Sequence, residues 1–233
     1  VRQAFMYAIN RDAIIQSLYG GAAEAANCVY TVDQLVPEGI EAFAYDPEKA
    51  KALLDEAGWA ELNGDKPITI LTYYTSPLVT NVLAAMQAML AQVGINIVPR
   101  AVDTPTYNSI VYGENYGDFP LIFAGLQNGP DPSNINIGLN ESQIPPAGAN
   151  IMRVRMPEVT AALDAALGET DAAARDAAFQ EVCKATNANL PWATMWVANR
   201  YGVASAKLEN FVWTPAPAGG PFQAHPEKWS VAQ

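Results

Sequence analysis

Residues 67–102 are PITILTYYTSPLVTNVLAAMQAMLAQVGINIVPRAV. Residues 67–74 are rich in β-branched and aromatic side chains, which favour a strand. From Leu78 to Val93 the apolar residues recur at helical spacing, and Gly94 is placed to end that helix. Residues 95–102 again have the composition of a strand. A strand, a helix and a strand with short links predict a βαβ unit with parallel strands and a right-handed crossover.

The residues before this unit predict helices with clear ends. Asn10 can cap a helix that stops at Gly20-Gly21, after a first helical segment that carries Phe5 and Ile9. Asp46 and Pro47 suit the N-cap and first position of another helix, which Gly58 would end. Helices that flank the βαβ unit on the N-terminal side are therefore expected.

The residues after the unit predict further elements of the same kind. They are a short helix at 106–114, a strand at 119–125, a long loop at 126–150, helices at 157–168 and 171–187 with Asp171 as a cap, and a strand or hairpin at 190–205. The Pro/Gly-rich segment from residue 207 onward predicts no further helix. The expected fold class is α/β, with a mixed sheet, a βαβ unit and flanking helices.

The composition disfavours some classes of function. The chain has 233 residues, half of them apolar, which suits one large domain or two small ones. Its net charge of −11 disfavours nucleic-acid binding, because an acidic surface repels phosphate. No apolar run is long enough to span a bilayer. Since Val1 stands directly inside an apolar-periodic segment, we expect the chain to be part of a longer protein.

Motifs for catalysis or cofactors are weak. The one histidine, His225, stands in a Pro-rich tail, and the two cysteines, Cys28 and Cys183, have no metal-ligand spacing; whether they form a disulfide is left open. Residues 131–136 resemble a calcium loop only faintly, since the required glycine is missing. No glycine-rich phosphate motif occurs. We therefore expect no cofactor, no metal and no catalytic residue.

Three segments together resemble the family 5 extracellular solute-binding proteins, which serve dipeptide, oligopeptide, nickel and related ABC importers. They are residues 1–14 (VRQAFMYAINRDAI), 45–59 (YDPEKAKALLDEAGW) and 150–159 (NIMRVRMPEV). Any one of them alone is weak, but all three occur in the family's order and spacing. The resemblance covers most of residues 1–205.

This resemblance implies a large C-terminal lobe of the periplasmic binding protein type II kind over residues 1–206. Residues 207–233 would return to the N-terminal lobe of the same protein. The implied function is capture of a small polar solute (peptide, opine, sugar or similar) between two lobes, for delivery to the membrane permease of an ABC transporter. The implied location is periplasmic or extracellular, with a lipid anchor in a Gram-positive organism. The alternatives are a small carboxylate-dependent hydrolase and a protein-interaction module.

The resemblance also implies a recognition loop after the strand at 119–125. The family's usual pattern there is Gly-Trp, an acidic residue and then Asp-Pro, whereas this chain has GLQNGPDP at 125–132. Leu126 replaces the tryptophan, Asp131 is kept, and Asn128 is nearest to the position of the carboxylate that holds a peptide's α-amine. A buried ammonium needs a carboxylate partner. Gln127 and Asn128 therefore favour a neutral or polar ligand over a standard peptide.

Two arginines and two tryptophans are further candidate ligand contacts. Arg153 could meet a carboxylate with two parallel hydrogen bonds, as could Arg155, although a surface arginine is the simpler interpretation. Trp192 and Trp196 are four apart, so on a strand they would share a face and could stack on a ligand. Core packing is the alternative for the tryptophans, and turn formation is the alternative for Asp131.

Overall fold

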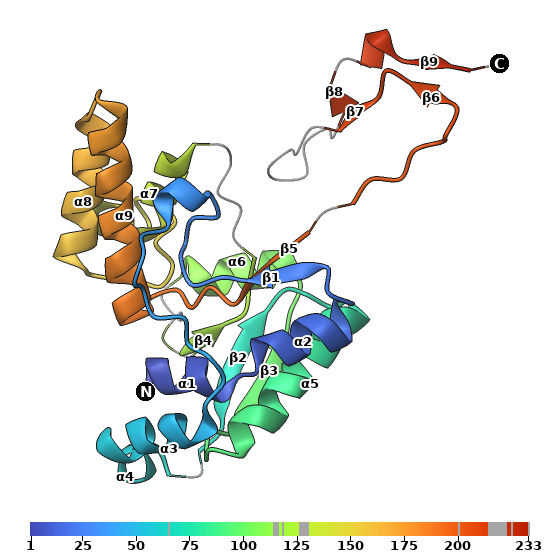
Figure 1. Ribbon diagram of the computed structural model, residues 1–233. Helices are drawn as coiled ribbons and strands as arrows, with labels where there is room; N and C mark the ends of the chain where they lie inside the picture. The colour runs from blue at the N-terminus through green and yellow to red at the C-terminus, as the bar shows by residue number, and fades with distance from the viewer. Residues whose placement is uncertain are drawn as a thin grey trace.

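The computed structural model describes residues 1–64, 66–113, 117, 119–125, 131–199, 201–213, 223–224 and 226–232 (Figure 1). Its centre is the predicted βαβ unit: strand β2 (Ile68–Thr72), helix α5 (Pro77–Ala91) and strand β3 (Ile97–Ala101). Strand β4 (Leu121–Ile122) adds to the other side of β2, giving the order β3-β2-β4 with every pair parallel. The predicted βαβ unit with parallel strands is confirmed, and the strand expected at 119–125 is present over residues 121–122 alone.

Helix α5 covers the sheet because of where its apolar residues and its ends fall. The Ser76 hydroxyl accepts the backbone N–H of Val79 at 3.3 Å, and Pro77 takes the first helical turn. The buried side chains of α5 are Val82, Leu83, Met86 and Leu90. Gly94, at φ 82°, allows the sharp return into β3, since only glycine adopts that backbone without strain.

Three N-terminal helices pack around this unit: α1 (Arg2–Ala8), α2 (Arg11–Leu18) and α3 (Pro47–Glu56). The predicted caps are confirmed, because Asn10 accepts from Ala13 N at 2.9 Å and Asp46 accepts from Lys49 N at 2.9 Å. A short helix that the sequence did not indicate, α4 (Trp59–Asn63), follows Gly58. The buried faces of α1, α2, α3 and α5 form the main core with the sheet.

A second core lies beneath a helical hairpin of α8 (Pro157–Gly168) and α9 (Ala172–Asn189), with Asp171 capping α9 as predicted. The segment expected to be a long loop contains short helices in its described part: η3 (Pro132–Ile135), α7 (Asn136–Leu139) and η4 (Glu141–Gln143). The 3₁₀ turn η1 (Asp33–Leu35) packs on α9. A disulfide joins Cys28 to Cys183 on α9, which settles the question that the sequence left open.

Two more elements complete the body. Helix α6 (Thr104–Val111) follows β3, close to its predicted range. Strand β5 (Trp196–Ala198) pairs antiparallel with β1 (Ala23–Ala25), with Trp196 opposite Ala25. The expectation of a strand or hairpin across 190–205 was therefore too long. Within the described residues β5 pairs with β1 alone, over residues 196–198, and this pairing sets its length.

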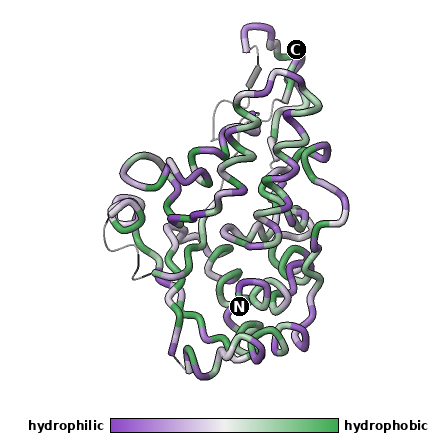
Figure 2. The backbone as a smooth tube through the Cα atoms, turned by 90° about the vertical axis from the view of Figure 1, so that its left-hand side faces the viewer, coloured by the Kyte–Doolittle hydropathy of each residue, from purple (hydrophilic) through white to green (hydrophobic). Residues whose placement is uncertain are grey.

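The C-terminal tail pairs with itself. Strand β6 (Leu208–Glu209) pairs with β9 (Ser230–Val231), and β7 (Val212–Trp213) pairs with β8 (Gln223–Ala224). One 3₁₀ turn, η6 (Pro226–Lys228), lies between β8 and β9, where no helix was expected. In Figure 1 the tail extends away from the body beyond β5, and in Figure 2 the C-terminal end lies at the top of the molecule. The division at residue 206/207 remains a prediction.

In the described part of the chain, every helix is too short or too polar to cross a membrane.

Candidate functional site

The three parallel strands place their carboxyl ends at one edge of the sheet. Tyr73 and Tyr74 follow β2, Asp103 follows β3, and Phe123 follows β4. In open α/β sheets, ligands bind in the crevice outside the carboxyl ends of the strands. The carboxyl edge of the sheet is therefore the candidate binding site.

Aromatic rings line this edge in an unbroken series. We call Tyr74, Phe123, Trp196 and Tyr19 the aromatic wall. Its ring centroids are 6.4 Å apart from Tyr74 to Phe123, 6.3 Å from Phe123 to Trp196, and 5.6 Å from Trp196 to Tyr19. Edge-to-face and tilted pairs at these separations attract one another. All four rings are half-buried, so the wall is both supported from behind and accessible.

At the Tyr74 end of the wall, the hydroxyl groups of Tyr73 and Tyr74 meet. Tyr73 donates its O–H to the Tyr74 oxygen at 3.1 Å, and the Tyr73 ring packs edge-on against Tyr107 at 4.9 Å. Burial, together with the hydrogen bond from Tyr73, raises the pKa of Tyr74 to about 12. Burial likewise raises the pKa of Tyr107 to about 12. Both hydroxyls are therefore neutral at physiological pH.

Gly125 stands where the wall meets the predicted recognition loop. A Cβ added at this glycine would collide with the Tyr74 hydroxyl. The absence of a side chain thus allows Tyr74 to lie against the backbone at the start of the loop. Leu126, Gln127 and Asn128 lie outside the described residues, and their ligand contacts remain predictions.

Asp131, at the far end of the loop, is occupied with a helix cap. Its carboxylate accepts the backbone N–H of Ser133 at 2.9 Å at the start of η3. This backbone hydrogen bond is the main reason that the pKa of Asp131 lies below its ordinary value, and the charge of Arg175 lowers it further. The geometry matches the turn-forming alternative, and a ligand contact by Asp131 stays a prediction.

Arg153 also bonds to its own chain. Its guanidinium donates to the carbonyls of Pro145 at 3.2 Å and Gly113 at 2.9 Å, which joins the end of α6 to the segment before α8. Asn150, fully buried, holds the same segment by accepting Val154 N and donating to Val154 O. A role of Arg153 toward a ligand carboxylate is untested. Its contacts within the described chain are structural.

The two tryptophans do not share a strand face, so that prediction was wrong. Strand β5 begins only at Trp196, and Trp192 lies in the turn that precedes it. Trp192 packs against the second core, with its ring edge over Gly138 of α7, whereas Trp196 packs on the main core. Of the predicted tryptophan contacts, Trp196 lies in the aromatic wall and Trp192 lies elsewhere.

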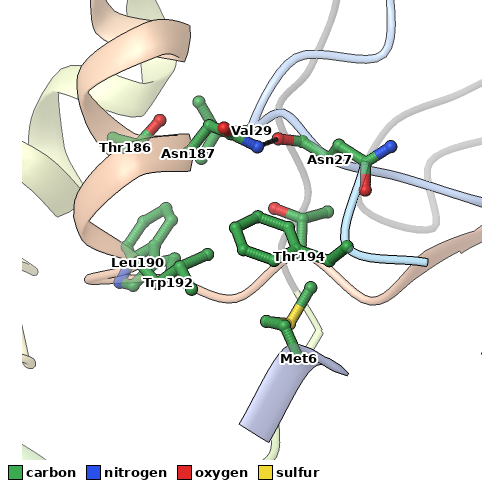
Figure 3. A pocket seen from close by; sticks show the side chains of 9 residues that line it. Met6, Asn27, Val29, Thr186, Asn187, Leu190, Trp192 and Thr194 are labelled. Atoms are coloured by element: carbon green, nitrogen blue, oxygen red, sulfur yellow. Dashed lines mark hydrogen bonds between the residues drawn. The ribbon is translucent and has the colours of Figure 1, made fainter. Parts of the chain in front are cut away.

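Trp192 instead lines a small cavity at the junction of the two cores, with Met6, Phe43 and Leu190 among the other walls (Figure 3). Its polar lining includes the side chains of Asn27, Thr186, Asn187 and Thr194, so polar and apolar groups both face it. The Asn187 amide is already bonded within the chain, since it donates to the carbonyls of Asn27 and Glu41 and accepts from Glu41 N. The cavity is smaller than a usual ligand pocket.

Sequence inspection missed most of the wall. Tyr19, Tyr74 and Phe123 were assigned to a helix end and to strands, without a role in binding. An available signal was that Tyr74 stands at the carboxyl end of the strand predicted at 67–74, and that Phe123 lies near the end of the strand predicted at 119–125. Within the described residues, no group of three or more His, Cys, Asp or Glu side chains is arranged to hold a metal ion.

The fold is that of a type II periplasmic binding protein. The oligopeptide-binding protein AppA of Bacillus subtilis, solved with a nonapeptide, superimposes with a TM-score of 0.82 over the whole chain and 47% of its own, at 22% identity. HbpA2 of Haemophilus parasuis gives a TM-score of 0.79 over the whole chain and 45% of its own, at 21% identity. At such identities the likeness shows the fold alone.

The chain belongs to the bacterial extracellular solute-binding proteins, family 5, whose middle-region model matches residues 1–144. A Brucella melitensis protein named "Putative ABC transporter peptide-binding protein" is 80% identical over the whole chain, which spans 45% of that relative. The dipeptide-binding protein of Escherichia coli is 49% identical over 59 residues, 25% of this chain and 11% of that protein. The chain thus spans about half the length of the curated relatives that match all of it.

Proposed function

We propose that this chain forms one lobe of the substrate-binding component of an ABC importer, and that the transported solute is a peptide. The family membership supports the transport role. The names of the Brucella relatives, 80% identical to this chain, support a peptide over an opine or a sugar. Residues 1–206 would hold one side of the solute, and the tail from residue 207 would return to the other lobe. The protein would act outside the cytoplasm and deliver its solute to a membrane permease.

The observation that carries the proposal is the aromatic wall at the carboxyl edge of the sheet. Strand β5 contributes Trp196 to the wall and then leads through exposed residues to the tail. In Figure 1 the tail leaves the body on the side of β1 and β5. The wall therefore lies beside the connection to the rest of the protein. Two lobes that close around a hinge would enclose a solute there and exclude water from it.

Binding to the full-length protein tests this proposal. Differential scanning fluorimetry with short peptides, opines and sugars should show a rise in melting temperature for peptides, since a ligand at 100 times its Kd adds about 2.7 kcal/mol to stability. Isothermal titration calorimetry would then give the affinity. A melting-temperature rise with sugars or opines and none with peptides would contradict the peptide assignment. Turnover of a ligand, lost on replacing one carboxylate, would favour the hydrolase.

The recognition loop is tested separately. Replacing Gln127 and Asn128 by alanine in the full-length protein should weaken binding with little loss of stability, because amides on a loop contribute more to recognition than to the core. Unchanged affinity in the double variant would mean that the loop does not contact the solute.

A further inference from the structure

We propose that the aromatic wall selects solutes that present an uncharged aromatic group, such as a Phe, Tyr or Trp side chain of a peptide. This inference rests on the proposed function, since it names the solute class for the same site. It predicts that this lobe recognises a side chain of the peptide through contacts with aromatic rings. An ion pair with a charged group of the peptide would not be the main contact.

The first support is the rigidity of the wall. Phe123, Trp196 and Tyr19 each pack their inner side on the main core, which fixes the orientation of the rings. Their mutual angles, 50° from Phe123 to Trp196 and 60° from Trp196 to Tyr19, leave ring faces and edges in different directions. An aromatic guest can therefore meet one ring by its edge and another by its face. Little ordering entropy is lost on the protein's side, because the rings are already held in place.

The second support is that the protein's own cations contact other rings. In the described ranges, the two cation–ring contacts are Lys49 over Tyr7 and Arg100 over Phe119. Neither Tyr7 nor Phe119 belongs to the wall. The half-exposed faces of Trp196 and Phe123 are thus not covered by a lysine or arginine of the described chain.

The third support is the placement of the nearby carboxylates. On β1, Glu24 pairs with Val197, so it points to the face of the ribbon opposite Trp196. Asp103 and Asp131 cap α6 and η3 through the backbone N–H groups of Thr106 and Ser133. Among these described carboxylates, none is directed at the wall, so an ammonium group there would lose water without gaining one of them as a partner, which is costly. A neutral ring carries no such cost and is the favoured guest.

Matched peptides and the full-length protein test this inference. The ligands are three tripeptides, Ala-X-Ala, with X as Phe, Ala or Lys, titrated by calorimetry. We expect the Phe peptide to bind about tenfold or more tighter than the Ala peptide, given the area that a buried ring removes from water. The Lys peptide should bind no better than the Ala peptide.

Variants assign the preference to the wall. In Trp196→Ala the Phe-to-Ala ratio should fall to within about threefold. Trp59→Ala is the matched control, because Trp59 is also half-buried against the main core but lies on α4, where its Nε1 donates to Gly94 O. Its ratio should stay at the wild-type value. Phe123→Leu, which keeps the apolar volume and removes the ring, is a second wall variant should Trp196→Ala fail to fold.

Equal affinity for the Phe and Ala peptides in the wild type would overturn the inference, as would tightest binding by the Lys peptide. A full Phe preference in both wall variants would also overturn it. These outcomes leave the proposed function intact, since peptides still bind. Failure of all three peptides, and of a mixed peptide library, would count against the proposed function itself.

Discussion

Replacing Arg11 should strongly destabilise the protein, because this arginine is only 6% exposed and joins three segments to α2. Its guanidinium donates to the carbonyls of Ala26 and Ala42, each at 2.6 Å, and to the Asn27 side chain at 2.8 Å. Longer bonds reach Met195 O at 3.3 Å and Phe43 O at 3.4 Å. Every acceptor is neutral. We call this set of contacts the Arg11 network.

The magnitude follows from what the substitution leaves behind. A hydrogen bond to a charged group contributes about 1.5–3 kcal/mol, but five such contributions do not add, since one side chain makes them all. Arg11→Met leaves several buried carbonyls without a donor, at about 1–3 kcal/mol for each one that water cannot reach, and we expect a total loss of about 3–5 kcal/mol. Arg11→Lys should lose about 2 kcal/mol, because an ammonium has three donors in place of five.

Urea unfolding followed by tryptophan fluorescence measures the effect in the full-length protein. Arg2→Met is the matched control, since Arg2 is exposed on the neighbouring helix α1, and it should change the unfolding free energy by less than about 0.5 kcal/mol. If Arg11→Met and Arg11→Lys both stay within about 1 kcal/mol of wild type, the Arg11 network is not a stabilising element and the reasoning fails.

Three more predictions follow from the described contacts. Replacing Cys28 and Cys183 together by serine should lower the unfolding free energy by about 2–5 kcal/mol, since the disulfide closes a loop with a sequence separation of 155 residues. Dithiothreitol should then destabilise the wild type but leave the double variant unchanged. Arg153→Ala should cost about 1–3 kcal/mol in urea unfolding through its two carbonyl bonds, with peptide affinity unchanged by calorimetry. A large affinity loss without a stability loss would instead support the ligand contact predicted from the sequence. The pKa of Tyr74, raised to about 12, gives stability that is complete below the ordinary pKa near 10 and lost as pH rises toward 12. In a tyrosinate absorbance titration, Tyr74→Phe should remove one high-pH transition, and loss of a transition near pH 10 would contradict the assignment.

Local signals made the helices predictable. Asn10, Asp46 and Asp171 cap helices with hydrogen bonds to a backbone N–H three residues ahead, so each signal lies within a few positions of its effect. The βαβ unit was equally accessible, because its apolar period changes at Gly94 within one continuous stretch. Helix α4 was missed because it is a single turn with no buried residue and therefore no periodic pattern.

The binding edge was only partly predictable, because its parts come from distant positions in the chain. Position 19 meets position 196, and position 74 meets position 123, through pairings that no local pattern encodes. The two-residue length of β4 also weakened its signal. For Trp192 and Trp196, a spacing of four would place them on one face only if the whole segment were extended. The pairing of β5 with β1 covers residues 196–198 alone.

The Arg11 network and the aromatic wall are physically connected, which bears on how stability and binding relate in this chain. Arg11 holds the carbonyl of Met195, the residue directly before Trp196, and α2 carries Arg11 at its start and Tyr19 at its end. Two of the four wall rings are therefore placed by elements that Arg11 joins. A substitution at Arg11 should weaken peptide binding even at temperatures where the protein stays folded, because Trp196 and Tyr19 lose their fixed separation. A substitution that destabilises only the α8–α9 hairpin should leave peptide binding unchanged at temperatures where the hairpin stays folded. The reason is that the hairpin belongs to the second core.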